Sequence, residues 1–176
     1  QLINSAVTAY SQYAGRIFIN EGVGDIDVEQ IRETIERHIR FTGRKPLVLV
    51  DYLQIVAPYS ERATDKQNTD KAVLELKRIS RDFKTTVIAI SSLNRMSYKD
   101  AISMEAFKES GAIEYSADVL LGLQLKGAGK KDFDATAEKK KNPRTIELVI
   151  LKNRNGAVGE RATFAYYPLF NFFEEE

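Results

Sequence analysis

The 176-residue sequence contains no cysteine, which excludes a disulfide framework and a thiolate metal site and fits a reducing compartment. It also lacks an excess of charge of either sign, because 26 Lys and Arg balance 25 Asp and Glu to a formal net charge of +1. Nucleic-acid binding would therefore need a local basic patch. No apolar run is long enough to span a bilayer, and no charged-then-apolar leader precedes a cleavage site. We expect a cytoplasmic protein with no membrane partner.

The composition is otherwise that of an ordinary globular protein. Hydrophobic residues make up 43% of the chain and charged residues 29%, enough to build the core of one domain. We therefore expect a single domain over residues 1–176, with the glycine-bearing, lysine-rich stretch 127–143 as a surface loop. The sequence starts without methionine and inside a helical pattern, so we interpret it as a piece of a longer protein.

Residues 47–56, LVLVDYLQIV, form the stretch around which the predicted fold is organised. Four apolar residues run directly into Asp51, a pattern typical of a fully buried parallel strand that ends in a carboxylate. A second uninterrupted apolar strand, residues 85–91, is followed by Ser92. Ligands bind at the carboxyl edge of open α/β sheets, where a carboxylate suits Mg²⁺ beside nucleotide phosphates. The simpler alternative is a strand that merely ends in a polar residue.

Helical periodicity and capping signals predict helices around these strands. The first helix is expected to stop at Gly15. The second begins at the N-cap Asp27 and ends near Gly43. A third apolar stripe, which starts at Ala72, predicts a helix up to about Asp82, and the sequence RIFIN at 16–20 predicts a short strand.

The C-terminal half predicts further strands. Residues 119–125 form a third apolar strand, and residues 145–152 and 160–167 form an antiparallel hairpin across an Asn-Gly turn. Its near end presents Lys152 and Arg154, and the final three glutamates are interpreted as a charged tail. The alternation of strands and helices predicts an α/β fold, with a mostly parallel sheet, helices on both faces and a C-terminal antiparallel hairpin.

Four motifs together resemble the ATPase domain of DnaB-family replicative DNA helicases. They are LVLVDYLQIV, VIAISSLNR, KESGAIEYSAD and ILKNRNGAVGE, in the family's order and at roughly its spacing, from Arg16 to about Phe173. The resemblance implies a RecA-like P-loop NTPase core within a hexameric ring. Such a ring hydrolyses ATP with Mg²⁺ and unwinds DNA by translocating on single-stranded DNA. A primase or a helicase loader would be a further partner.

The resemblance assigns roles to four residues at the nucleotide. Asp51 would be the Walker B carboxylate that holds Mg²⁺ and its water. Lys152 and Arg154 match the KxRNG element, which reaches across a subunit interface to the γ-phosphate of a neighbour's ATP. Ser92 occupies the place of a glutamine that senses the γ-phosphate, and its shorter hydroxyl would hydrogen-bond there directly or through water. From the residues alone, a basic hairpin that is merely solvent-exposed is the alternative.

Arg95, Lys108, Glu109 and Gly111 match positions in the loops that line the central channel and grip single-stranded DNA. Backbone amides and cations suit sugar-phosphate contacts, which carry no sequence information. A glycine lets the chain approach a phosphate closely. Few aromatic residues accompany these positions, so we expect backbone contacts and little base stacking. An ordinary loop of mixed charge is the alternative.

The sequence departs from the family at its N-terminal side. It contains no GxxxxGK[ST] loop and no glutamate following such a loop, the residue that activates the attacking water in the family. The first strand of the core would be absent with them, and truncation explains this better than degeneration. We expect the 176 residues alone neither to bind ATP tightly nor to hydrolyse it.

Two other functions stay open at this point. One is a non-catalytic RecA-like module kept for assembly or partner binding, and the other is a RecA- or RadA-type recombinase paralogue that binds DNA as a filament. An upstream GKT loop followed by a glutamate would favour the helicase over the module. A ring rather than a filament in electron microscopy would exclude the recombinase.

Overall fold

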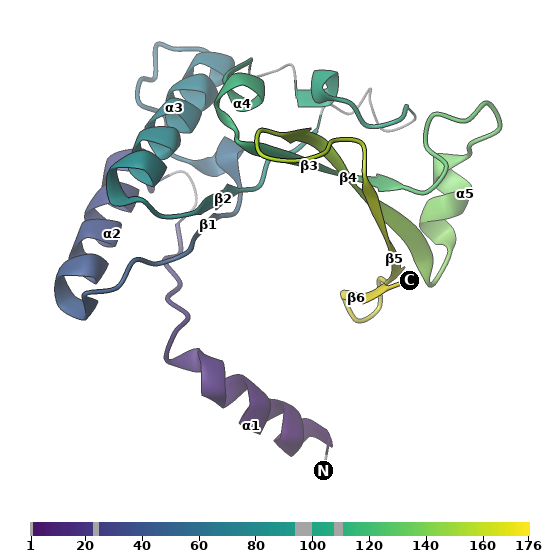
Figure 1. Cartoon of the computed structure of the whole chain (residues 1–176), viewed down its shortest axis with the longest axis horizontal. Coiled ribbons are helices and arrows are strands. Elements are labelled where there is room, and N and C mark those ends of the chain that lie inside the picture. Colours follow the sequence, from purple (N-terminus) through teal and green to yellow (C-terminus); the bar gives the residue numbers. More distant parts are fainter. Residues whose placement is uncertain (1, 23–24, 94–99, 108–110) are drawn as a thin grey trace.

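The computed structural model describes residues 2–22, 25–93, 100–107 and 111–176. Figure 1 shows two sheets, with α2 and α3 beside the shorter one. Short 3₁₀ helices cover Leu53–Ile55 and Met104–Phe107. The other elements, in chain order, are α1 (Leu2–Ala14), α2 (Val28–Thr42), β1 (Val48–Val50), α3 (Asp65–Phe83), β2 (Val87–Ala89), α4 (Gly111–Ser116), β3 (Val119–Leu125), α5 (Ala135–Lys140), β4 (Arg144–Asn153), β5 (Arg161–Tyr167) and β6 (Phe172–Glu175).

β1 and β2 form a two-stranded parallel sheet. Val48 pairs with Val87, and Val50 pairs with Ala89. Parallel neighbours need a crossover connection, and α3 supplies it here. The prediction that the two apolar stretches lie side by side in the same direction is confirmed, although each strand is only three residues long.

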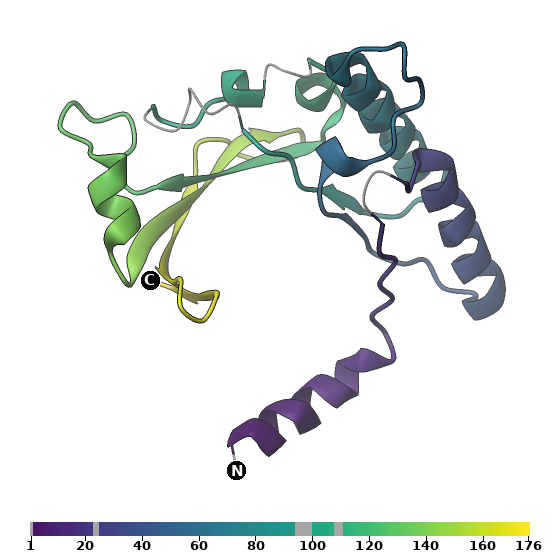
Figure 2. The ribbon, with the colours of Figure 1, turned by 180° about the vertical axis from the view of Figure 1, so that it is seen from behind.

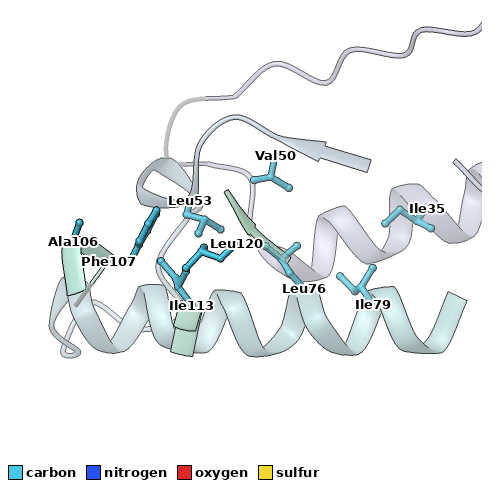
Figure 3. Close-up of a cluster of buried hydrophobic side chains, with 9 residues drawn as sticks. All are labelled: Ile35, Val50, Leu53, Leu76, Ile79, Ala106, Phe107, Ile113 and Leu120. Atoms are coloured by element: carbon cyan, nitrogen blue, oxygen red, sulfur yellow. The ribbon is translucent and has the colours of Figure 1, made fainter. Parts of the chain in front are cut away.

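A cluster of buried side chains joins one face of this sheet to α2 and α3 (Figure 3). Val50 of β1, Ile35 of α2 and Leu76 of α3 are all buried, and Ile79 of α3 is 0% exposed. In Figure 3, Ile35 and Ile79 lie between the two helices. Burying an aliphatic side chain contributes about 1.5–3 kcal/mol. The cluster therefore fixes both helices against β1.

None of the described helices covers the other face of the parallel sheet. Leu49 and Ile88, which are paired across the two strands, are 63% and 46% exposed. Parallel sheets normally have helices on both faces. Here α2 and α3 pack on one face, while α1 lies away from the rest of the chain in both views (Figures 1 and 2). The predictions of fully buried strands and of helices on both faces were therefore wrong for this chain.

The second sheet is antiparallel, with strand order β3-β4-β5-β6. The predicted hairpin of β4 and β5 is confirmed. The structure differs from the sequence analysis at both edges, because β3 pairs with β4 in antiparallel fashion and the glutamate-rich end of the chain forms β6. Tyr166 explains the second difference. Its ring stacks on Phe173 with centroids 4.4 Å apart, and its hydroxyl donates to Asn171 Oδ1 at 2.8 Å.

The helix boundaries follow local capping chemistry. Asp27 Oδ1 accepts the Gln30 backbone N–H at 2.8 Å, and α2 ends at Gly43 with φ of 66°. α3 begins at Asp65, earlier than the clearly apolar part at residues 72–83, because Thr64 and Gln67 form a second capping box. The prediction of a strand at 16–20 was wrong, since this segment lies outside every helix and strand that the structure describes.

The lysine-rich stretch 127–143, predicted as a surface loop, contains the helix α5. Asp134 caps this helix by accepting the backbone N–H groups of Thr136 and Ala137 at 2.8 and 3.1 Å. Among the described helices, none is both long and apolar enough to cross a membrane.

Candidate functional site

Asp51 and Ser92 follow neighbouring parallel strands at the same edge of the sheet. Asp51 comes directly after β1, and Ser92 comes shortly after β2 ends at Ala89. The Ile90 backbone N–H donates to the Val50 carbonyl at 2.9 Å, so the backbone pairing continues up to Asp51. The two strand ends therefore lie side by side, as the sequence analysis predicted.

Gln54 connects these two strand ends. Its Nε2 donates to Ser91 Oγ at 3.0 Å, and its Oε1 accepts the backbone N–H of Ser92 at 3.3 Å. Ser92 is thus held through its backbone, with its side chain exposed. Sequence reasoning missed Gln54 and Ser91 as site residues. Gln54 could have been identified from the sequence, because it is the single amide in the otherwise apolar stretch that follows Asp51.

The chemistry of this edge fits Mg²⁺. Asp51 is exposed, and its carboxylate and the Ser92 hydroxyl offer the hard oxygen atoms that Mg²⁺ prefers. In the described ranges, no group of three or more His, Cys, Asp or Glu side chains could hold a metal ion. A lone carboxylate suits a Mg²⁺ ion that takes its other ligands from water and phosphate oxygens.

Lys152 and Arg154 lie together at the C-terminal end of α4. Lys152 Nζ donates to the Glu114 and Tyr115 carbonyls at 2.6 and 3.4 Å. Arg154 donates to the Tyr115 carbonyl at 2.9 Å and to Asp118 Oδ1 at 3.1 Å. The last carbonyls of a helix lack intrahelical partners and carry partial negative charge, so they attract cations.

The four residues predicted at the nucleotide therefore lie in two separate groups. Asp51 and Ser92 share the edge of the parallel sheet, whereas Lys152 and Arg154 share the end of α4. Within the described part of the chain, no hydrogen bond or ion pair joins the first group to the second.

Asp118 is the anion that Arg154 contacts. Lys77 Nζ, from α3, forms an ion pair with its other carboxylate oxygen. The hydrogen bond from Lys77, with the nearby positive charges of Arg154 and Lys152, holds the pKa of Asp118 below its ordinary value despite opposing desolvation. Asp118 is therefore ionised at neutral pH.

This ionisation makes stability depend on pH. Because the pKa of Asp118 is lowered in the folded state, its contribution is fully present above the ordinary aspartate pKa and is lost as the pH falls below about 4. The side chain is 51% exposed, so we expect Asp118→Asn to cost at most about 1 kcal/mol at pH 7. Urea unfolding of the unmodified chain and of the Asp118→Asn variant should show the difference between their free energies of unfolding shrinking toward pH 2. A difference that widens in acid would contradict the assignment.

The predicted DNA-binding residues are only partly covered by the structure. Arg95, Lys108 and Glu109 lie outside the described residues. Gly111 is the first residue of α4, and the described atom nearest to a Cβ added there is in the Tyr115 ring, at 4.0 Å. Among the described residues, none would therefore crowd a side chain at Gly111.

Curated relatives of the chain are replicative DNA helicases. It is 33% identical over 162 residues to replicative DNA helicase DnaC of Bacillus subtilis, a match that covers 89% of this chain and 33% of that protein. It is 32% identical over 155 residues to replicative DNA helicase DnaB of Geobacillus stearothermophilus, covering 84% of this chain and 32% of that protein. The chain thus spans about a third of the length of these relatives.

Many solved structures match the chain, and two of them share its fold with a TM-score of 0.70. One is an ATPase domain, which matches with a TM-score of 0.70 and 25% identity over 84% of this chain and 51% of that one. The other is a DnaB-like replicative helicase described with its interactions with primase. It matches with a TM-score of 0.70 and 25% identity over 84% of this chain and 35% of that one. These matches confirm the predicted RecA-like α/β fold. The family model for the DnaB-like helicase C terminal domain matches residues 2–175, and the chain belongs to that family.

Proposed function

We propose that this chain is part of a hexameric, ATP-dependent replicative DNA helicase that unwinds DNA by translocating on single-stranded DNA in the cytoplasm. The observation that carries the proposal is the parallel pair of strands that ends in Asp51 and Ser92 at one edge. Its membership of a helicase family supports the same conclusion and favours it over a recombinase or a non-catalytic module.

Asp51 and Ser92 act at the nucleotide in this proposal. Asp51 holds Mg²⁺ through its carboxylate, and Ser92 presents a hydroxyl toward the γ-phosphate. When bound, Mg²⁺ neutralises charge on the β- and γ-phosphates during phosphoryl transfer. Gln54 keeps both strand ends in place through its bonds to Ser91 and Ser92.

Lys152 and Arg154 act on a neighbouring subunit's ATP. Their contacts lie at the end of α4 and not with Asp51, so the basic pair lies apart from the Asp51 edge of its own chain. An arginine can bind phosphate oxygens through two parallel N–H groups, which suits charge that develops during transfer.

Arg95, Lys108, Glu109 and Gly111 contact the DNA backbone in this proposal, and a primase or a helicase loader binds elsewhere on the ring. The solved DnaB-like helicase described with primase supports the primase as a partner. Backbone contacts predict affinity that falls with salt and varies little with base sequence.

The proposal is tested in the restored helicase, meaning this chain joined to an upstream segment that carries the phosphate-binding loop. We expect Asp51→Asn to lower DNA-stimulated ATP turnover by about 100-fold or more, because a neutral amide cannot balance the charge of the metal ion. The matched control is Glu61→Gln, an exposed carboxylate in the following loop. Turnover that survives Asp51→Asn would remove Asp51 from the site.

A further inference from the structure

Arg154 already has partners inside its own chain. One terminal nitrogen of its guanidinium donates to Asp118 Oδ1 at 3.1 Å, and the other donates to the Tyr115 carbonyl at 2.9 Å. Its backbone N–H donates to the Asp118 carbonyl at 2.9 Å. These two side-chain bonds occupy one N–H of each terminal nitrogen, so binding a phosphate through the same N–H groups requires the guanidinium to exchange Asp118 and Tyr115 for the phosphate.

Asp118 is itself anchored to a rigid element. Lys77, which pairs with its second carboxylate oxygen, belongs to α3, and neighbouring Leu76 and Ile79 place this helix in the core. Two cations from distant parts of the chain thus share one carboxylate. Removing either cation changes how strongly the carboxylate attracts the other.

We propose that Asp118 is a positioning residue that holds Arg154 against the end of α4 until the nucleotide of a neighbouring subunit takes its place. This inference rests on the proposed function of Arg154. α4 begins at Gly111, one of the expected DNA-binding residues, and ends at the carbonyls that Arg154 and Lys152 share. This short helix therefore connects Gly111, the expected DNA contact, to Arg154. In this proposal, DNA binding at Gly111 weakens the hydrogen bonds that keep Arg154 at the other end of α4.

The test compares ATP turnover of the restored helicase without DNA and with saturating single-stranded DNA. Asp118→Asn keeps the size of the side chain and removes its charge. We expect DNA-independent kcat to rise about two- to fivefold, the range that an exposed ion pair supports. The ratio of DNA-stimulated to DNA-independent kcat should fall by a similar factor.

A second variant gives an effect of opposite sign. Lys77→Gln removes one of the two ion pairs of Asp118, so the carboxylate attracts Arg154 more strongly. DNA-independent kcat should therefore fall, while the ratio of DNA-stimulated to DNA-independent kcat rises. The control is Glu75→Gln, which breaks the ion pairs with Lys71 and Arg78 on the same helix and should change neither rate. If Asp118→Asn and Lys77→Gln leave both rates unchanged, or shift them in the same direction, the positioning role is wrong.

Arg154→Ala separates this inference from the proposed function. If Arg154→Ala leaves turnover unchanged, the proposed role of Arg154 on a neighbour's ATP is wrong. If Arg154→Ala abolishes turnover while Asp118→Asn changes neither rate, only the positioning role of Asp118 is overturned.

Discussion

Arg154→Ala in the restored helicase should lower DNA-stimulated ATP turnover by about 10³-fold or more, the effect of losing an arginine that stabilises phosphoryl transfer in trans. The structure supports this expectation, because the Arg154 guanidinium lies at the end of α4 and makes no described contact with Asp51. ATP binding should change much less than turnover, since the charge that Arg154 meets develops mainly during transfer.

Mixing two inactive variants distinguishes a shared site from a site within one subunit. Rings assembled from Arg154→Ala and Asp51→Ala subunits should recover part of the activity, because some interfaces then combine an intact Asp51 with an intact Arg154. Rings of either variant alone provide the baseline. Mixed rings that stay at this baseline, with assembly verified by light scattering, would contradict action in trans.

Ile79→Ala should cost the isolated chain about 2–5 kcal/mol, the range found when a large buried aliphatic side chain is truncated. Ile79 is 0% exposed and belongs to the cluster that joins α2, α3 and β1 (Figure 3). Truncation removes its contacts and leaves a cavity between elements that pack closely. The shift should appear in the midpoint of urea unfolding, with little change in the slope.

Leu74→Ala is the matched control for this prediction. Leu74 lies on the same helix and is 46% exposed, so its truncation should cost well under half as much as that of Ile79. Equal costs at Ile79 and Leu74 would mean that the buried cluster does not hold the helices against β1.

Local features were predictable from the sequence because local chemistry determines them. The Asp27 capping box, the Gly43 stop and the polar end of β1 each depend on residues within one turn of the chain. The strand predicted at residues 16–20 was wrong because strand formation depends on a distant partner and not on local residues alone. An apolar stretch indicates strand propensity, but a strand forms only where a partner strand pairs with it.

Pairing and long-range contacts could not be predicted in the same way. The alternation in β3 indicates which side chains share a face, and it does not tell whether the neighbour is β2 or β4. Lys152 and Arg154 were recognised by their motif. Their contacts with Tyr115 and Asp118 join residues more than thirty positions apart, so only the tertiary structure reveals them.

In the proposed ring, one nucleotide is bound by Asp51 of one subunit and Arg154 of the next. The most direct measurement is a cryo-EM structure of the restored helicase with Mg²⁺ and a non-hydrolysable ATP analogue. We predict the Asp51 carboxylate beside the metal ion and the neighbour's Arg154 within hydrogen-bond distance of the γ-phosphate. A nucleotide contacted by Asp51 and Arg154 of the same subunit, or by neither residue, would contradict the claim.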